Sequence, residues 1–181
     1  MKIDAKISKL GRQIAGLAVM VTAGSLTACT TTAPPGPVVR TGAQTAAISS
    51  TVTAPVGYET IYLSGMTGTL RAPDGSPPNT PAPDSGDTEA QATRALGNIK
   101  SALASKGLGF GDIVMMHAYL APDPSTGRGD SAGWSRAYSK FFGVADQPNK
   151  PARTSVTVVL GSPAAKIEIE TIAVRKPAGK N

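Results

Sequence analysis

The strongest constraint on the fold is a stripe of apolar residues at helical spacing in the middle of the chain. Thr88 precedes the stripe, Gln91 follows three residues later in a capping-box pattern, and Gly107 is the expected end. The stripe consists of Ala92, Ala95, Leu96, Ile99, Ala102 and Leu103. Because residues three and four positions apart share one face of a helix, the sequence predicts an amphipathic helix that buries this face.

Strand patterns occur on both sides of this helix. Residues 60–66 alternate and are rich in β-branched and aromatic side chains, and a second strand is expected at about 67–71. After the helix, residues 112–120 form an apolar run that is typical of a buried strand. Two further strands are expected over 154–160 and 166–174.

A second helix is expected over residues 131–142. Its apolar face consists of Trp134, Ala137, Tyr138 and Phe141, and Gly143 is the expected stop. The resulting order is β-β-α-β-α-β-β, in which helices do not alternate strictly with strands, and this order predicts an α+β fold. The segment 72–86 contains five prolines and no apolar periodicity, which predicts a long surface loop.

The N-terminus predicts an export signal that is not part of the fold. Residues 1–12 carry four basic side chains and one acidic side chain, whereas residues 13–28 carry no charge. The apolar centre of this stretch, about 14–26, is shorter than the ~20 residues that a membrane-spanning helix needs. A basic head, a short apolar centre and small residues at the end are typical of a secretory signal.

The single cysteine closes this segment, in Leu26-Thr27-Ala28-Cys29, which resembles a bacterial lipobox. The resemblance implies a signal peptide over 1–28 and a diacylglyceryl group on Cys29, whose buried CH₂ groups each contribute ~0.8 kcal/mol to membrane binding. Because Thr30 rather than aspartate follows, we expect a periplasmic lipoprotein in the outer membrane of a double-membraned bacterium. The alternative is an ordinary signal peptide with a coincidental cysteine.

The segment after the cysteine predicts a tether. Residues 29–45 include Pro34, Pro35 and Pro37, which favour extended polyproline conformations over packed structure. We therefore expect the globular domain to cover residues 46–176, with a short tail over 177–181.

The net charge of +6 does not indicate a nucleic-acid partner. Of the 18 basic and 12 acidic residues, four and one lie within residues 1–28, so half of the excess belongs to the signal segment. One cysteine and one histidine exclude an internal disulfide framework, a multi-thiolate zinc site and a metal centre with two or three histidines. We expect no metal and no cofactor.

Three positions could carry chemistry. Arg153 opens an expected strand, so its guanidinium is placed at a sheet edge, where a cleft can form. Glu168 and Glu170 alternate with apolar residues, which puts both carboxylates on one face of the last strand. Spacing alone leaves open an ordinary surface ion pair for the arginine and a solvated strand face for the glutamates. His117 lies within an apolar run and is expected to be a buried or interface histidine with a satisfied hydrogen bond.

Several segments resemble successive blocks of the Rid (RidA/YjgF) family. The similarity covers about residues 46–176, and its most specific parts are 151–156 (PARTSV) and 166–174 (KIEIETIAV), with shorter blocks at 87–100, 111–114 and 138–142. The resemblance implies a chorismate-mutase-like subunit in a homotrimer, with active sites in the clefts between subunits. It also implies hydrolysis of enamine or imine intermediates to a 2-oxo acid and ammonia.

The resemblance also implies roles for individual residues. Arg153 would hold the substrate carboxylate through a bidentate pair, and Glu168 would orient or deprotonate the attacking water. Ser64, Gly65 and Ser155 would complete the substrate-binding site, whereas Glu170 is expected to have a structural role. The sequence departs from the family pattern at Ser49-Ser50-Thr51 (usually Gly-Pro-Tyr), Met66 (usually glutamine), Ser135 (usually asparagine) and Ser155 (frequently cysteine).

These departures keep a second class of function open. A trimeric small-carboxylate-binding or scaffold lipoprotein without catalysis would retain the arginine but not the reaction. RNA cleavage, which is attributed to some family members, is disfavoured by export and by the lack of a basic run with interleaved aromatic residues. We therefore expect a small imine or enamine carboxylate as substrate, a membrane contact through lipid, self-association, and no nucleic acid.

Overall fold

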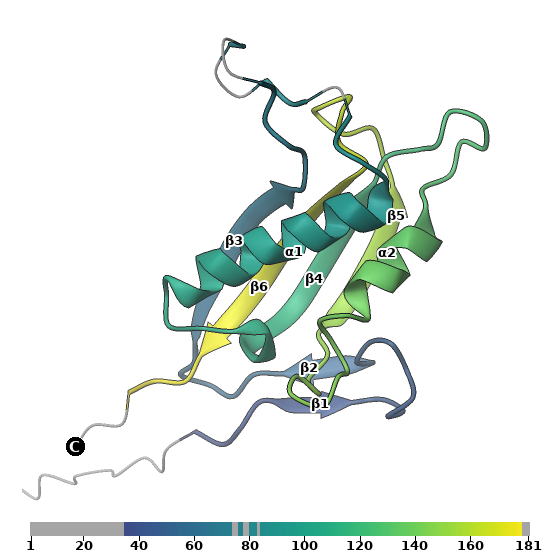
Figure 1. Ribbon diagram of the computed structural model, residues 1–181. Coiled ribbons are helices and arrows are strands. Elements are labelled where there is room, and N and C mark those ends of the chain that lie inside the picture. The colour runs from purple at the N-terminus through teal and green to yellow at the C-terminus, as the bar shows by residue number, and fades with distance from the viewer. Residues whose placement is uncertain (1–34, 74–75, 78–79, 83, 179–181) are drawn as a thin grey trace, which may run out of the picture. The chain divides into compact units, whose positions relative to one another are not determined.

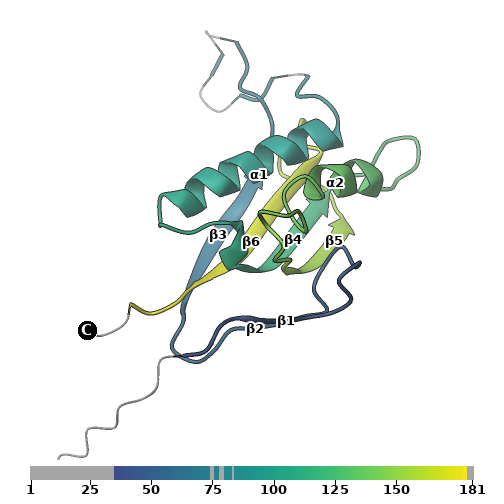
Figure 2. The same ribbon diagram turned by 60° about the horizontal axis from the view of Figure 1, so that its bottom comes forward.

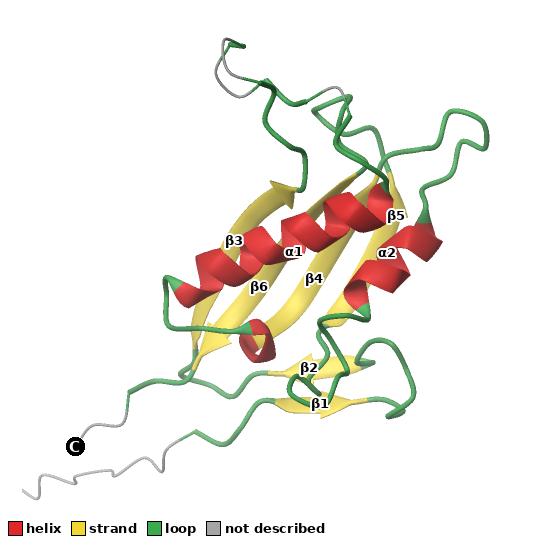
Figure 3. Cartoon of the chain, in the orientation of Figure 1, coloured by secondary structure: helices red, strands yellow, loops and turns green. Residues whose placement is uncertain are grey.

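A four-stranded mixed sheet forms the framework of the structure (Figures 1 and 3). The computed structural model describes residues 35–73, 76–77, 80–82 and 84–178. The strand order is β3-β6-β4-β5, with β3 at Glu59–Thr67, β6 at Ile167–Arg175, β4 at Ile113–Leu120 and β5 at Ala152–Thr157. β4 and β5 are parallel, and the other two pairings are antiparallel. The predicted α+β class is confirmed, and β5 forms one edge of the sheet, as expected for the strand that carries Arg153.

Both helices lie on the same face of this sheet (Figure 2). α1 (Thr88–Ala104) follows β3, and α2 (Ser131–Tyr138) lies in the crossover between the parallel strands β4 and β5. A 3₁₀ turn, η1 (Phe110–Asp112), leads into β4. The opposite face of the sheet is covered by no helix within the described part of the chain. We call it the open face.

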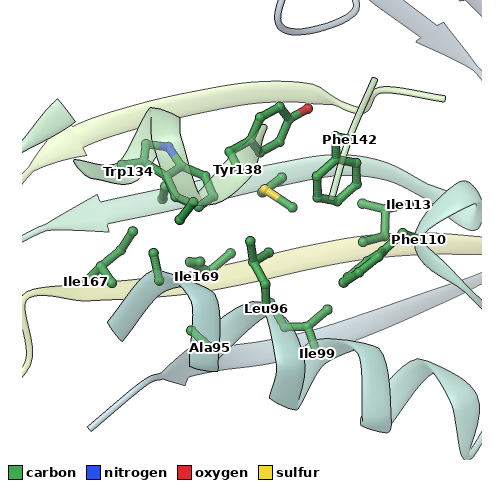
Figure 4. Close-up of a cluster of buried hydrophobic side chains, with 14 of the residues drawn as sticks. Ala95, Leu96, Ile99, Phe110, Ile113, Trp134, Tyr138, Phe142, Ile167 and Ile169 are labelled. Carbon is green, nitrogen blue, oxygen red and sulfur yellow. The ribbon is translucent and has the colours of Figure 1, made fainter. Parts of the chain in front are cut away.

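The hydrophobic core lies between the helices and the sheet (Figure 4). The predicted stripe of α1 is buried there except for Ala102, which is partly exposed, and Leu96 and Ile99 lie fully inside. Trp134 and Tyr138 of α2 pack edge to face, with ring centroids 5.5 Å apart. From the sheet, Ile167 and Ile169 of β6 complete the same layer. Each buried aliphatic or aromatic side chain of this kind contributes about 1.5–3 kcal/mol to folding, so this layer fixes the position of α2 above β5.

The N-terminal cap of α1 differs from the predicted capping box by one residue. Asp87, not Thr88, is the cap, and its carboxylate accepts a hydrogen bond of 2.8 Å from the backbone N–H of Ala90. Gln91 is buried and binds the chain that enters β6. Its Nε2 donates to the carbonyl of Ala164 at 3.1 Å, and its Oε1 accepts from the N–H of Lys166 at 2.8 Å. An acidic cap was available one residue earlier, so the glutamine could serve a tertiary contact instead.

A hairpin that the sequence did not predict precedes the sheet. β1 (Val39–Thr41) pairs with β2 (Thr51–Thr53) in antiparallel fashion. The Arg40 guanidinium anchors it by donating to the carbonyls of Gly111 at 2.8 Å and Ile113 at 3.2 Å. The prediction of a tether as far as residue 45 was therefore wrong for β1. Proline content favours extended backbone, but it does not reveal whether that backbone finds a partner strand.

Two further boundaries differ from the predictions. No strand forms over 67–71; instead Arg71 and Pro81 form an isolated bridge, and the N–H of Leu70 donates to the Ser85 hydroxyl at 2.9 Å. The backbone after β3 thus pairs within the 72–86 loop rather than in the sheet. α2 ends at Tyr138 instead of residue 142, and the chain turns at Gly143 with φ +76°.

The predicted signal segment 1–28 and Cys29 lie outside the described residues. Within the described ranges, no helix has both the length and the hydrophobicity that a bilayer span requires.

Candidate functional site

The sheet register places the two predicted catalytic residues on opposite faces. Residues that pair directly across neighbouring strands point to the same face. Arg153 pairs with Met116, which is fully buried under the helices. Glu168 pairs with Tyr119, one position out of phase with the buried residues of β4, so its carboxylate lies on the open face. Within one chain, therefore, the arginine and the glutamate do not meet.

The Arg153 guanidinium lies against the aromatic side chains of α2. Its Cζ is 4.2 Å from the ring centroid of Tyr138 and 5.2 Å from that of Trp134. Burial lowers the pKa of Arg153, and Tyr138 opposes this effect, but an arginine stays charged at any physiological pH. The Nη1 atom is buried and has no hydrogen-bond partner among the described residues. A buried, charged donor without a partner is costly, so this atom is a ready binding point for an anion.

The Tyr138 hydroxyl is a second buried donor beside the guanidinium. It has no hydrogen-bond partner in the described structure. Burial raises the pKa of Tyr138 to about 12, and the charge of Arg153 only partly offsets this rise. The phenol is therefore neutral at physiological pH and can donate a proton to an oxygen atom that binds at Arg153.

A cavity of about 250 Å³ opens onto Arg153 and Tyr138. None of the described residues that line it is acidic, whereas Arg153 and Lys150 supply two cations. The other lining residues are Gln44, Thr45, Ala46, Ala47, Ser135, Ser139, Phe142 and Gly143. The Arg153 guanidinium, a neutral phenol and two serine hydroxyls suit a small anion such as a carboxylate, whereas the Lys150 ammonium donates to two backbone carbonyls. We call this space the arginine cavity.

Glu168 lies against β3 on the open face. A Cβ atom at position 65 would overlap the Glu168 carboxylate, so only glycine leaves room for it. Ser64 is the exposed neighbour of Gly65, at the bulge where the register of β3 shifts. The predicted residues Ser64 and Gly65 thus accompany Glu168 and not Arg153.

The open face carries further titratable groups beside Glu168. Glu170 shares this face, as predicted from its parity, and its Oε1 lies 2.8 Å from Nδ1 of His117. The expected hydrogen bond of His117 is therefore present, although its side chain retains 28% exposure and is not buried. Partial desolvation raises the pKa of Tyr119, and the neighbouring carboxylates of Glu170 and Glu168 raise it further. No group of three or more potential ligands gathers around a metal position in the described ranges.

The remaining sequence-predicted positions differ in their contacts. Ser155 lies on the helix-covered face with Arg153, but its hydroxyl accepts a hydrogen bond of 3.1 Å from Trp134 Nε1, and it does not line the arginine cavity. Thr51 pairs with Thr41 across the hairpin, with their hydroxyl oxygens 2.7 Å apart. Met66 packs against the core, and Ser135 lines the cavity.

Sequence reasoning missed three contributors to the cavity. Tyr138 was assigned only to the apolar face of α2, and Lys150 received no role. Residues 44 and 45 were assigned to a tether, and residues 46 and 47 only to the start of the domain. A signal for Tyr138 was present, because a tyrosine four residues after a tryptophan, before a strand with an arginine, is suited to stack on that arginine. Residues 44–47 gave no comparable signal.

The chain is similar to a family model over most of its folded part and to curated relatives over about half of its length. A family model described as Endoribonuclease L-PSP matches residues 43–175. Protein DfrA of Myxococcus xanthus is 37% identical over 89 residues, which cover 49% of this chain and 61% of DfrA. A 2-iminobutanoate/2-iminopropanoate deaminase of Escherichia coli is 36% identical over 90 residues, 50% of this chain and 66% of that protein. The matched region spans less than two thirds of each of these two relatives.

Solved structures agree with the observed architecture. Escherichia coli TdcF, crystallised with bound serine, is 29% identical, with a TM-score of 0.51 over 66% of this chain and 83% of TdcF. The YjgF gene product of Escherichia coli is 32% identical, with a TM-score of 0.50 over 66% of this chain and 83% of that protein.

Proposed function

The chain belongs to the Endoribonuclease L-PSP (Rid/YjgF) family, and we propose on this basis that it hydrolyses small imines of 2-oxo acids to the 2-oxo acid and ammonia. The observation that carries the proposal is the partly buried Arg153, whose guanidinium lies over the ring of Tyr138, has an unpartnered Nη1 among the described residues, and belongs to a residue that lines a small cavity. Relatives named as deaminases of 2-iminobutanoate and 2-iminopropanoate support this reaction.

Arg153 would bind the substrate carboxylate. Its planar guanidinium can donate two parallel hydrogen bonds to the two carboxylate oxygens, which a lysine ammonium cannot reproduce. The ring of Tyr138 holds the plane of the guanidinium, and its hydroxyl can donate to the same carboxylate. Binding would thus satisfy two buried donors at once, and it would place the imine carbon at the mouth of the arginine cavity.

Glu168 would activate the water that attacks the imine carbon. The carboxylate accepts a proton from water as the oxygen adds to the C=N carbon, and the nitrogen takes up a proton to give a carbinolamine. The carbinolamine then collapses: its hydroxyl proton passes to the nitrogen, the C=O double bond forms, and the C–N bond breaks to release ammonia. An enamine substrate would first be protonated at carbon to give the imine. Because Arg153 and Glu168 lie on opposite faces of one chain, the proposed reaction needs a glutamate from a second copy.

Assembly would supply that second copy. We propose a homotrimer in which the open face of one chain, with Glu168, meets the arginine cavity of its neighbour. A heterologous contact repeated around a threefold axis closes into a ring and generates three equivalent sites.

The size of the arginine cavity favours a small acid over a nucleotide chain. Its volume of about 250 Å³ lies below the usual range of ~300–1,000 Å³ for ligand pockets. RNA cleavage, which the description of the family model names, would need a longer basic groove with stacking platforms. The proposed partners are therefore a small imine or enamine carboxylate and other copies of the chain, without nucleic acid.

A second candidate function is carboxylate binding without catalysis. The specific observation in its favour is that a single chain assembles only the binding half of the site. This alternative predicts saturable binding of pyruvate at Arg153 with no release of ammonia from an imine.

The test is ammonia release from 2-iminopropionate generated in situ, with the full-length protein in detergent. We expect Arg153→Ala to lower kcat/KM about 100-fold, which corresponds to about 2.7 kcal/mol of lost transition-state stabilisation. Arg153→Lys keeps the charge but loses the two parallel guanidinium donors, so it should recover only a small part of the rate. Lys140→Ala, which removes a positive charge from an exposed residue that does not line the cavity, is the matched control. Wild-type turnover equal to that of Arg153→Ala would exclude the proposed reaction.

We propose that the chain works at a membrane surface outside the cytoplasm, attached through a lipid on Cys29. The support is the lipobox-like sequence that ends at the single cysteine. A stable anchor takes two acyl chains or more, because one chain alone binds reversibly. Labelled palmitate should enter the protein in a bacterial host and should not enter Cys29→Ala. Equal labelling of both would refute the anchor.

A further inference from the structure

One wall of the arginine cavity is formed by the loop between β1 and β2. Four of its residues, 44–47, line the cavity opposite α2. We call residues 43–49 the wall segment. The segment contains no regular helix or strand, so its position depends on the contacts that it makes with the rest of the fold.

Lys150 takes part in most of the hydrogen bonds that join the wall segment to other described residues, and Ile48 packs against the core. The Lys150 Nζ donates hydrogen bonds of 2.7 Å to the carbonyl of Gln44 and 2.7 Å to the carbonyl of Ala46. In the other direction, the Ser49 hydroxyl donates to the carbonyl of Lys150 at 2.6 Å, and the Ser49 N–H donates to the carbonyl of Pro151 at 3.1 Å. The wall segment is thus attached at both ends to the residues that lead into Arg153.

A glycine makes room for this lysine. Gly143 has φ +76°, and a Cβ atom there would approach the Lys150 Cε to 2.8 Å. Gly143 also lines the cavity, just after the turn that carries Phe142. The aliphatic part of the Lys150 side chain therefore packs against Gly143, between the wall segment and the residues that lead into β5.

We propose that Lys150 is a positioning residue that holds the wall segment against the arginine cavity and so sets the affinity for the bound carboxylate. The inference rests on the proposed function for the identity of the ligand. The role of Lys150 itself is different from that of Arg153, because its Nζ donates to backbone carbonyls of the wall segment. Two of the three ammonium protons are used on carbonyl oxygens, and these bonds are stronger than neutral ones because the donor is charged.

The expected change in affinity follows from the fraction of molecules in which the wall segment is held against the cavity. When only a fraction of the protein has the cavity formed, the apparent dissociation constant rises by the inverse of that fraction. If removal of the ammonium reduces this fraction to about one tenth, KM and the dissociation constant of pyruvate each rise about tenfold. The reacting groups themselves are unchanged, so kcat stays near the wild-type value.

The experiment compares Lys150→Met with Lys150→Arg in the full-length protein. Lys150→Met keeps the stem and removes the charge, whereas Lys150→Arg retains donors for both carbonyls. Lys106→Met is the matched control, because this lysine is exposed and does not line the cavity. The readouts are the dissociation constant of pyruvate by calorimetry, the separate values of kcat and KM, and deuterium uptake of peptides that cover residues 43–49.

We expect Lys150→Met to weaken pyruvate binding and to speed deuterium uptake in the wall segment, and Lys150→Arg to recover most of both. Unchanged binding in Lys150→Met, or faster exchange across the whole domain instead of the wall segment, would overturn the proposal. Deuterium uptake needs no ligand and no turnover, so it separates the two proposals. If Arg153→Ala binds pyruvate as the wild type does, the carboxylate site is refuted. If Arg153→Ala loses binding but Lys150→Met does not, the carboxylate site stands and the role of Lys150 in affinity is refuted.

Discussion

Two inactive variants should restore activity to each other if the site is shared between copies. Arg153→Ala removes the carboxylate-binding group and leaves Glu168 intact, whereas Glu168→Gln does the reverse. Because the two residues lie on opposite faces of one chain, each proposed site takes its arginine from one copy and its glutamate from the next. A mixed assembly therefore contains some interfaces at which both groups are wild type.

The size of the effect follows from counting interfaces. With equal amounts of the two variants and random assembly, a given interface has an intact arginine on one side and an intact glutamate on the other in about one quarter of cases. The mixture should therefore show about one quarter of the wild-type turnover of 2-iminopropionate, although each parent is nearly inactive. Co-expression with two different affinity tags, followed by sequential purification, enriches the mixed assemblies for the assay.

The control is a mixture in which no interface can be intact. Arg153→Ala mixed with the double variant Arg153→Ala/Glu168→Gln forms assemblies of the same size but restores nothing. The division of the site between chains would be refuted by one result. The first mixture would contain mixed assemblies, but its turnover would not exceed the sum of the turnovers of the two single variants.

Three further substitutions test individual contacts. Tyr138→Phe keeps the ring under Arg153 and removes an unpartnered buried hydroxyl, so it should raise KM several-fold without lowering Tm; a fall in Tm of several degrees would show that the hydroxyl has a structural partner. Gly65→Ala forces the Glu168 carboxylate to move, and kcat should fall more than KM rises, whereas an unchanged kcat would remove the carboxylate from the reaction. Glu89 on α1 pairs with two cations of the α2 region, whose hydrogen bonds and charges lower its pKa below the ordinary 4.5. A lowered folded pKa gives stability that is present above the unfolded value and is lost as pH falls through the folded one. Glu89→Gln should therefore flatten Tm against pH in the acid range, and an unaltered profile would show that the pair contributes nothing.

Periodicity in the sequence was enough to predict the layers of the fold. The stripe of α1, the buried run of β4 and the alternation of β6 each reflect a local repeat imposed by burial on one side. Boundaries that depend on competing local hydrogen bonds were less predictable. Asp87 rather than Thr88 forms the N-terminal cap of α1, and the backbone after β3 pairs within the 72–86 loop instead of with the sheet.

Only part of the candidate site was predictable from the sequence. Arg153 was singled out by its position at the start of a strand, and Glu168 and Glu170 by their alternation with apolar residues, whereas Tyr138, Lys150 and the arrangement of these groups were not predicted. The opposite orientation of Arg153 and Glu168 depends on how β4 aligns with β5 and with β6, and these non-local registers have no signature within either strand. The hairpin of β1 and the wall segment were missed for the same reason, since a partner distant in sequence decides their structure.

The open face gives an independent physical reason to expect assembly. Tyr62 and Val156 keep 77% and 42% of their surfaces exposed on the described chain, beside the carboxylates of Glu168 and Glu170. Large apolar groups around the proposed catalytic carboxylate are unfavourable in water. They become useful when a second chain covers them, because exclusion of water strengthens the charge interactions of the site. A contact that buries this face against the arginine cavity of a neighbour would therefore satisfy Arg153, cover Tyr62 and complete the proposed active site in one step. Dilution of the protein until the copies separate should then abolish turnover before it abolishes binding of pyruvate.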